Sequence, residues 1–299
     1  MSKELNPLIG KHVELDPSLT VAVIGAAGKM GMRVSNNLNL TDATIHYCEA
    51  SEGGKARLAE LGRTVSTVEE AVPAADVVIL AVPDVVLGKV SEQIVPMMQA
   101  DSVLLTLDPA AAYAGLLAQR DDVHPACAHP AHPSIFLERT TVEEYADTFG
   151  GIAADQDVVA AIESDDEAAR ARTEAVVRAI YAPVIDVHWV TVKQLAQLEP
   201  TLVETTACMI GQFLKDSMDH AINEVGIPEG AVKSLFYGHI GIALTNALRG
   251  SNPFSEACLL AMDYGRDAII KDDWKRIWDD EDLDVVLAKM LKLEKIERN

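Results

Sequence analysis

The fold of this 299-residue chain is decided by the stretch Val21-Ala22-Val23-Ile24-Gly25-Ala26-Ala27-Gly28-Lys29-Met30-Gly31. Its four apolar residues are typical of a buried strand, and the residues after its last glycine are predicted to form a helix. A strand that turns tightly into a helix presents backbone N–H groups and the helix dipole to a phosphate. The candidate dinucleotide-binding residues are therefore Gly25, Ala26, Ala27, Gly28, Lys29, Met30 and Gly31. A glycine-rich turn without a ligand is the alternative.

An acidic residue follows the turn at the distance expected of a dinucleotide-binding unit. Glu49 ends a second predicted strand, Thr44–Cys48, roughly 20 residues after the turn. Its carboxylate can accept hydrogen bonds from ribose hydroxyls and would repel a 2′-phosphate, which favours NAD over NADP. Lys55 and Arg57 lie just downstream, and they could tolerate such a phosphate.

The composition excludes several classes of partner. Acidic residues outnumber basic ones by 46 to 25, and the net charge is -21. This charge argues against binding to nucleic acid or to an anionic membrane surface. No uncharged apolar run reaches the length of a membrane span, and residues 1–20 lack an apolar signal core. The four cysteines are widely spaced, which indicates reduced thiols and a cytoplasmic protein; they are Cys48, Cys127, Cys208 and Cys258.

Strand and helix patterns alternate along the first part of the chain and stop near residue 188. The alternation predicts a doubly wound, parallel (Rossmann) α/β sheet over residues 1–188. The segment Cys127–Pro133 is expected to be a loop, because its two prolines resist helix. Residues 189–299 contain only helical patterns and are expected to form an all-helical domain for substrate binding and dimerisation. Cofactor and substrate are expected to meet at the carboxyl ends of the strands.

The motifs resemble the 6-phosphogluconate dehydrogenase-like superfamily, which includes β-hydroxyacid dehydrogenases and ketol-acid reductoisomerases. The glycine turn, the Ala81-Val82-Pro83 strand end and the helical second half carry this resemblance. It implies that Val82 and Pro83 lie beside the cofactor. The glycine turn, the His129-Pro130-Ala131-His132-Pro133 segment and Gln197-Leu198-Glu199-Pro200 together look like a narrower family, the D-apionate oxidoisomerases. Members of that family oxidise a branched sugar acid with NAD and rearrange its carbon skeleton.

The candidates for proton transfer are Lys193, Glu204 and His129, with His132 as the alternative to His129. Lys193 opens the first long helix of the second half and resembles the catalytic lysine that the superfamily's dehydrogenases carry at that place. A lysine that is desolvated in a closed cleft can become neutral and act as a base. Gln197 departs from the asparagine that the dehydrogenases carry one turn later, and a solvated lysine is the alternative. Glu204 falls on the face of an ideal helix that carries Lys193. His129 is expected near the mouth of the cleft, where it or His132 can bind a carboxylate or shuttle a proton.

A divalent metal site is expected from Glu199 and His239. The resemblance places metal-ligating carboxylates on the first long helix of the second domain, as in the reductoisomerases. Pro200 disturbs the hydrogen-bond ladder of that helix. His239 stands between glycines, and a Glu/His pair suits a divalent cation with open positions for substrate oxygens. A core histidine bonded to a carbonyl is the alternative.

The resulting hypothesis is an NAD-dependent oxidoreductase that acts on a small polyhydroxy acid with help from a metal ion. The narrower resemblance implies oxidation of a hydroxyl to a ketone, followed by migration of a hydroxymethyl group. Two alternatives remain: a β-hydroxyacid or 6-phosphogluconate-type dehydrogenase without metal, and a catalytically silent NAD-binding sensor. The long apolar helices indicate a homodimer.

Overall fold

The computed structural model describes residues 13–250 and 252–298. Most of residues 1–20, which are expected to lack an apolar signal core, therefore lies outside the described residues. The chain forms two compact units. The first comprises residues 1–199 and 284–299, and the second comprises residues 200–283. The boundary predicted at residue 188 lies some residues before this division, and the end of the chain returns to the first unit.

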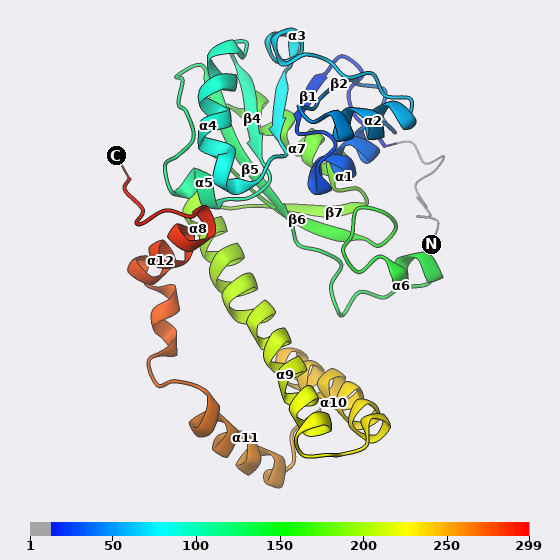
Figure 1. Cartoon of the computed structure of the whole chain (residues 1–299), viewed down its shortest axis with the longest axis vertical. Helices are drawn as coiled ribbons and strands as arrows, with labels where there is room; N and C mark the ends of the chain where they lie inside the picture. Colours follow the sequence, from blue (N-terminus) through cyan, green and yellow to red (C-terminus); the bar gives the residue numbers. More distant parts are fainter. Residues whose placement is uncertain (1–12, 251, 299) are drawn as a thin grey trace. The chain divides into compact units, whose positions relative to one another are not determined.

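The first unit is built on a seven-stranded sheet with the order β2-β1-β3-β4-β5-β6-β7 (Figure 1). Neighbouring strands from β2 to β5 are parallel, as are β6 and β7, whereas β5 and β6 are antiparallel. The predicted Rossmann-type sheet is confirmed, with one reversed pair. The strands are β1 (Thr20–Ile24), β2 (Thr44–Cys48), β3 (Val77–Leu80), β4 (Ser102–Thr106), β5 (Val123–Pro130), β6 (Gln156–Ile162) and β7 (Val184–Trp189).

Helices cover both faces of this sheet, because its central strands are apolar on both sides. α1 and α7 pack on one face over a core that includes Val23, Ile79 and Leu105. α5 and α8 pack on the other, where Leu195 meets Cys127. The helical segments up to residue 196 are α1 (Lys29–Leu38), α2 (Glu52–Glu60), α3 (Val68–Ala71), η1 (Val72–Ala74), α4 (Asp84–Ile94), η2 (Val95–Met97), α5 (Ala110–Tyr113), α6 (Val142–Ala146), α7 (Glu167–Ile180) and α8 (Val192–Ala196).

The prediction that Cys127–Pro133 forms a loop was wrong for Cys127–Pro130, which belong to β5. Cys127 pairs with Thr106 of β4, and Pro130 pairs with Val158 of β6, so the strand continues to Pro130. The residue before a proline is restricted to extended backbone, which excludes helix but is compatible with a strand. Pro130 is the last residue of β5, where its missing N–H costs little. This extension carries His129 to the carboxyl end of the strand.

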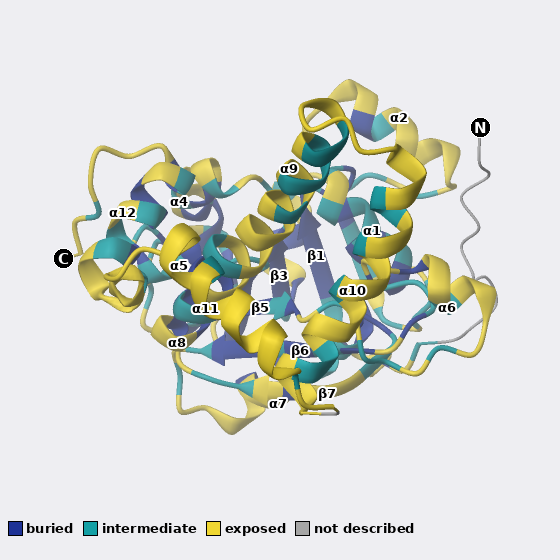
Figure 2. Cartoon of the chain, turned by 90° about the horizontal axis from the view of Figure 1, so that it is seen from below, coloured by how far each residue is buried: buried dark blue, intermediate teal, exposed yellow. Residues whose placement is uncertain are grey.

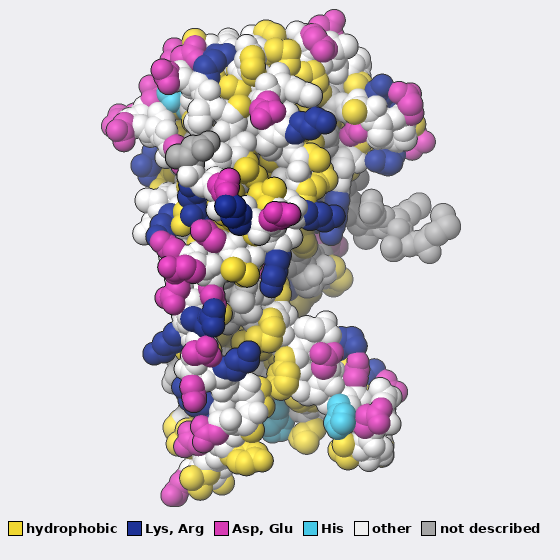
Figure 3. Space-filling view, turned by 60° about the vertical axis from the view of Figure 1, so that its left-hand side comes forward, with side chains coloured by type: hydrophobic (Ala, Val, Ile, Leu, Met, Phe, Trp, Pro, Cys, Tyr) yellow, Lys and Arg dark blue, Asp and Glu magenta, His cyan; other side chains and the backbone are white. Residues whose placement is uncertain are grey.

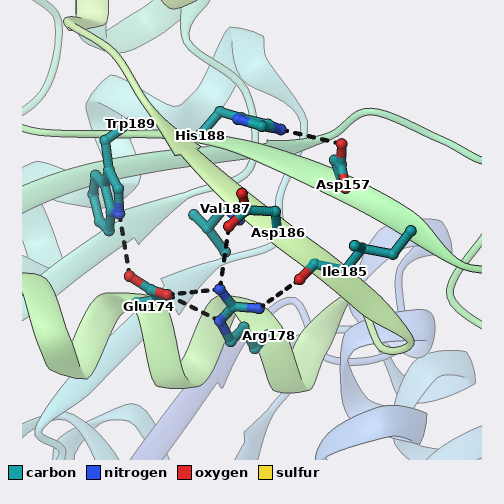
Figure 4. Close-up of polar contacts among 8 residues, drawn as sticks. All are labelled: Asp157, Glu174, Arg178, Ile185, Asp186, Val187, His188 and Trp189. Carbon is teal, nitrogen blue, oxygen red and sulfur yellow. Dashed lines mark hydrogen bonds and ion pairs between the residues drawn. The ribbon is translucent and has the colours of Figure 1, made fainter.

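The edge strand β7 is fixed to α7 by polar contacts (Figure 4). Glu174 of α7 accepts a hydrogen bond from Trp189 Nε1 at 3.2 Å and pairs with Arg178 at 2.8 Å. Arg178 also approaches Asp186 of the strand, with 3.6 Å between nitrogen and oxygen. Charged side chains on an edge strand protect its open backbone groups from pairing with another chain.

The first long helix of the second half, in which Pro200 is expected to disturb the hydrogen-bond ladder, changes its geometry at that proline but does not end there. It continues through η3 (Gln197–Cys208), a π-helical segment, into α9 (Met209–Asn223). Because proline has no N–H to donate, the α-helical ladder is interrupted there, and the wider π turn accommodates the break. The remaining segments are α10 (Glu229–Arg249), α11 (Glu256–Ile269), η4 (Trp274–Trp278) and α12 (Asp280–Leu291).

Among the described residues, no helix is both long enough and apolar enough to cross a membrane. On the face that Figure 3 draws, hydrophobic and charged side chains are mixed on the surface, and many large apolar residues of the second unit are exposed.

Candidate active site

The turn between β1 and α1 depends on its glycines. Gly25 has φ +81°, and a Cβ there would lie 2.8 Å from the carbonyl oxygen of Ala81. A Cβ on Gly31 would lie 1.9 Å from the carbonyl oxygen of Gly25. α1 begins after Gly28 with no side-chain cap and no acidic residue in its first turn. Neither the residue before the helix nor its first turn therefore supplies an acceptor that would compete with a phosphate for the first N–H groups.

Glu49 lies at the end of β2, beside this turn. Its Oε2 accepts a hydrogen bond from the N–H of Ala27 at 3.1 Å, and its Oε1 accepts from the N–H and hydroxyl of Ser51 at 2.9 and 2.8 Å. Burial raises the pKa of Glu49, but these hydrogen bonds outweigh it and hold the pKa below its ordinary value. The group is thus a carboxylate at neutral pH, as the recognition of ribose hydroxyls requires.

The two cations that could accept a 2′-phosphate are already engaged. Lys55 pairs with Glu52 at 2.8 Å, and Arg57 donates to the carbonyl oxygen of Ala27 at 3.0 Å. Both cations therefore have contacts that compete with a 2′-phosphate. This favours NAD, whose ribose carries no such phosphate.

A cavity of about 350 Å³ extends from the glycine turn along the carboxyl ends of β3, β4 and β5. This volume lies in the range of small-molecule sites. The turn supplies one wall, the segment after β3 supplies another, and the ends of β4 and β5 close the far side. The lining residues are Gly28, Lys29, Met30, Leu80, Ala81, Val82, Pro83, Asp84, Leu87, Leu107, Asp108, His129, Pro130, His132 and Phe149. The predicted cofactor residues Val82 and Pro83 thus line the same cavity as the turn.

Three potential metal ligands converge in the first unit. Asp108, His129 and Glu199 each place a ligand atom within 4.8 Å of the other two. Asp108 follows β4, His129 belongs to β5, and Glu199 is the buried third residue of η3, with 5% of its surface exposed. Two carboxylates and one imidazole suit a divalent cation that keeps open positions for substrate oxygens. The donor set therefore fits the expected metal ion.

The backbone orients both histidines of this region. His129 Nδ1 lies 3.2 Å from the carbonyl oxygen of Leu107, and His132 Nδ1 lies 2.7 Å from that of Phe149. A carbonyl only accepts, so each Nδ1 carries the proton and each Nε2 keeps its lone pair in the neutral ring. Burial lowers the pKa of His129 to about 4. At neutral pH the ring is thus neutral, and the lone pair on its Nε2 is available to a metal ion.

Three other predicted residues are neither among the cavity-lining residues nor in the cluster of Asp108, His129 and Glu199. Lys193 is exposed on α8 of the first unit, after a capping box between Thr191 and Gln194. Glu204 is an exposed residue of η3 in the second unit. His239 is exposed on α10 of the second unit, and its Nδ1 lies 2.8 Å from the carbonyl oxygen of Leu235. Their functional roles remain predictions.

Sequence reasoning missed Asp84 and Asp108 as site residues. Asp84 is the first residue of α4, in the connection after β3, and Asp108 lies two residues after the end of β4; both line the cavity. Burial raises the pKa of Asp84. Asp108 also has a local contact, since its Oδ1 accepts a hydrogen bond from the N–H of Ala110 at 2.8 Å. A polar residue at the carboxyl end of a central strand was the signal that could have identified both.

Two family models match this chain, and each covers more than half of it. The NADPH-binding domain of acetohydroxy acid isomeroreductase matches residues 17–180. The C-terminal domain of decarboxylating phosphogluconate dehydrogenase matches residues 137–291. Together they confirm the resemblance to the superfamily of reductoisomerases and phosphogluconate dehydrogenases.

Individual relatives identify a narrower family within this superfamily. The D-apionate oxidoisomerase of Pectobacterium atrosepticum is 55% identical over 93% of this chain and 98% of its own length. That of Cupriavidus necator is 39% identical over 88% of this chain and 96% of its own. A semialdehyde dehydrogenase NAD-binding protein from Cupriavidus necator, solved in complex with calcium and NAD, superposes with a TM-score of 0.88. It is 37% identical and covers 91% of this chain and 99% of its own. Since these matches span nearly the whole sequence, the chain belongs to the family of the D-apionate oxidoisomerases.

Proposed function

We propose that this protein oxidises D-apionate with NAD and transfers a hydroxymethyl group within the oxidised acid. The observation that carries the proposal is the convergence of Asp108, His129 and Glu199. Asp108 and His129 line the cavity that begins at the phosphate-binding turn. An oxidation and a rearrangement of the same substrate require the hydride acceptor and the polarising group to face one cavity. The family relationship supplies the substrate class.

The residues around the turn fit NAD. The N–H groups of the first turn of α1 would hold the pyrophosphate, and Glu49 would accept hydrogen bonds from the adenosine ribose. Val82 and Pro83 would flank the nicotinamide half, because they line the cavity after β3. Bound NAD supplies the hydride acceptor for oxidation of the secondary hydroxyl.

Asp108, His129 and Glu199 would hold a divalent cation. Such a cation supplies a Lewis acid that polarises the ketone and the neighbouring tertiary hydroxyl of the substrate. His129 serves this role in the neutral form, which its lowered pKa maintains. The hydrogen bond from His129 Nδ1 to Leu107 fixes the ring so that Nε2 is the available donor atom.

Proton transfer in both steps needs a base within reach of the substrate hydroxyls. His132 lines the cavity and has Nε2 as its acceptor atom. Lys193 remains a candidate base from the family resemblance, Glu204 remains one from its predicted helix face, and His239 is a further metal-ligand candidate. Variants at these positions distinguish a base from a metal ligand. Loss of a base at Lys193 or Glu204 would lower kcat, whereas loss of a metal ligand at His239 would lower the affinity for the cation.

We also propose that the protein is a homodimer formed through its second unit. None of the residues of α9, α10 and α11 is buried (Figure 2). The exposed fraction of Leu235 is 67% and that of Phe213 is 41%. Apolar surface of this extent is typical of an interface, and a second copy would cover the same helices in both protomers. Light scattering on the full chain is expected to give twice the monomer mass, and a monomer would contradict the proposal.

The test of function is a reaction of the purified protein with NAD and D-apionate. Absorbance reports NADH, and carbon NMR of the product reports whether the skeleton has rearranged. We expect NADH and a rearranged product, both abolished by EDTA and restored by a divalent cation. NADH without rearrangement, or activity only on 6-phosphogluconate, would instead identify a dehydrogenase. NADH binding without any turnover would identify a sensor.

A further inference from the structure

The segment between β5 and β6 brings an aromatic ring to the cofactor cavity. This segment, residues 131–155, contains α6 and returns to the sheet through two glycines. Phe149 lines the cavity together with Lys29 and Met30 of the phosphate-binding turn. Its exposed fraction is 39%, although it is a large apolar residue. A ring that lines a cavity beside the phosphate-binding turn is in position to contact a ligand bound there.

The ring of Phe149 is held by its neighbours. The Arg33 guanidinium carbon lies 4.3 Å from the ring centroid, and the His132 ring centroid lies 4.5 Å from it. Lys29 Nζ lies 5.8 Å from the same centroid. A guanidinium over an aromatic face is attracted by the ring quadrupole, and the attraction is larger where the cation is partly desolvated. Arg33 is such a cation, because its side chain is partly buried, and this burial lowers its pKa.

The backbone around Phe149 is fixed as well. His132 Nδ1 contacts the carbonyl oxygen of Phe149 at 2.7 Å. Just before the ring in sequence, Asp147 Oδ2 accepts hydrogen bonds from three successive N–H groups, at distances of 3.1, 2.8 and 3.1 Å. Gly150 has φ +78°, and a Cβ there would lie 2.5 Å from Gln156 Oε1. The ring is therefore set in place before any ligand arrives, which lowers the entropic cost of binding.

We infer that Phe149 is a cofactor-contact residue that covers NAD where it passes the phosphate-binding turn, and that Arg33 is its positioning residue. The inference rests on the proposed NAD dependence. Bound dinucleotide would bury the exposed ring, and the ring would exclude water from that side of the cavity. Phe149 thereby acts on cofactor affinity, whereas the metal ligands act on the rearrangement.

The test is a titration of the full-length protein with NADH, followed by the fluorescence of the nicotinamide. We expect Phe149→Ala to raise the Kd for NADH roughly 10-fold, and Phe149→Leu to raise it less, because leucine retains part of the apolar contact. The matched control is Tyr145→Ala. Tyr145 is an exposed aromatic residue of α6, 64% exposed, that is not among the lining residues, and this variant is expected to bind NADH like the wild type.

Arg33 is tested by Arg33→Met, which keeps the aliphatic stem and removes the charge. We expect a rise in Kd for NADH and in KM for NAD with little change in kcat, and partial recovery in Arg33→Lys. Thermal melting of each variant identifies any loss of folding. Unchanged NADH affinity in folded Phe149→Ala, or an equal loss in Tyr145→Ala, would overturn the inference. If the wild type itself binds no NADH, the proposed function fails instead.

Discussion

His129 and Glu199 come from a strand and a π-helical segment, yet their ligand atoms lie within 4.8 Å of each other. Asp108 completes the group from the end of β4. Each residue alone has an ordinary structural interpretation. Their convergence, with Glu199 buried, is what supports a cation-dependent reaction in this fold.

Substitution Glu199→Gln is expected to weaken divalent cation binding and to lower kcat by on the order of 100-fold or more, because one anionic ligand is lost at similar volume. Calorimetric titration with Mn²⁺ and turnover assays measure the two effects. Glu163→Gln, at an exposed glutamate remote from the three ligands in sequence, is the control. Normal Mn²⁺ affinity in Glu199→Gln would remove Glu199 from the site.

Substitution Gly31→Ala is expected to abolish NADH binding and to destabilise the fold by about 2 kcal/mol or more, because the new Cβ would lie 1.9 Å from the carbonyl oxygen of Gly25. Gly53→Ala is a matched control inside α2, where the Cβ would meet only Arg57 Nη1 at 3.8 Å. The control should gain about 0.5–1 kcal/mol from helix propensity. Chemical denaturation and NADH fluorescence provide the measurements, and two variants of equal stability would contradict the turn geometry.

Substitution Glu49→Ser is expected to raise the KM for NAD and to reduce the preference for NAD over NADP by at least about 10-fold. The serine removes the carboxylate that is proposed to bind the ribose and to repel a 2′-phosphate. Initial rates with both cofactors give the ratio. Glu52→Gln, which releases Lys55 from its ion pair, tests the contribution of that cation separately. An unchanged ratio in Glu49→Ser would show that another group selects the cofactor.

Substitution His132→Val is expected to destabilise the protein by about 1–2 kcal/mol, whereas His132→Asn should leave its stability near that of the wild type. His132 has φ +60°, a conformation that asparagine tolerates and a β-branched residue does not. Both variants remove Nε2 from the cavity, so both should lower kcat. Denaturant titration compares the stabilities, and full activity in His132→Asn would exclude a role for Nε2.

Removal of divalent cations is expected to abolish turnover and to leave NADH affinity largely unchanged. The dinucleotide is expected to bind through the turn and Glu49, and none of these residues belongs to the cluster of Asp108, His129 and Glu199. Parallel measurements of turnover and NADH fluorescence before and after EDTA separate the two functions. A loss of both would indicate that the cation also supports the cofactor.

The sequence by itself determined the parts of this protein that depend on neighbours along the chain. The glycine spacing from Gly25 to Gly31 predicts the turn, because local steric contacts restrict those positions. Continuous apolar runs predict buried parallel strands. The distance of Glu49 from the glycine turn predicts its role in binding the ribose. The family resemblance came from the same local motifs.

Only the tertiary structure decided how distant segments meet. It made Cys127–Pro130 part of a strand, because pairing with β4 and β6 supplies hydrogen bonds that the local proline pattern does not reveal. It brought Asp108 beside His129 and Glu199, and it placed Arg33 against Phe149. These contacts join residues that no periodicity connects, so they depend on packing of the whole sheet and its helices.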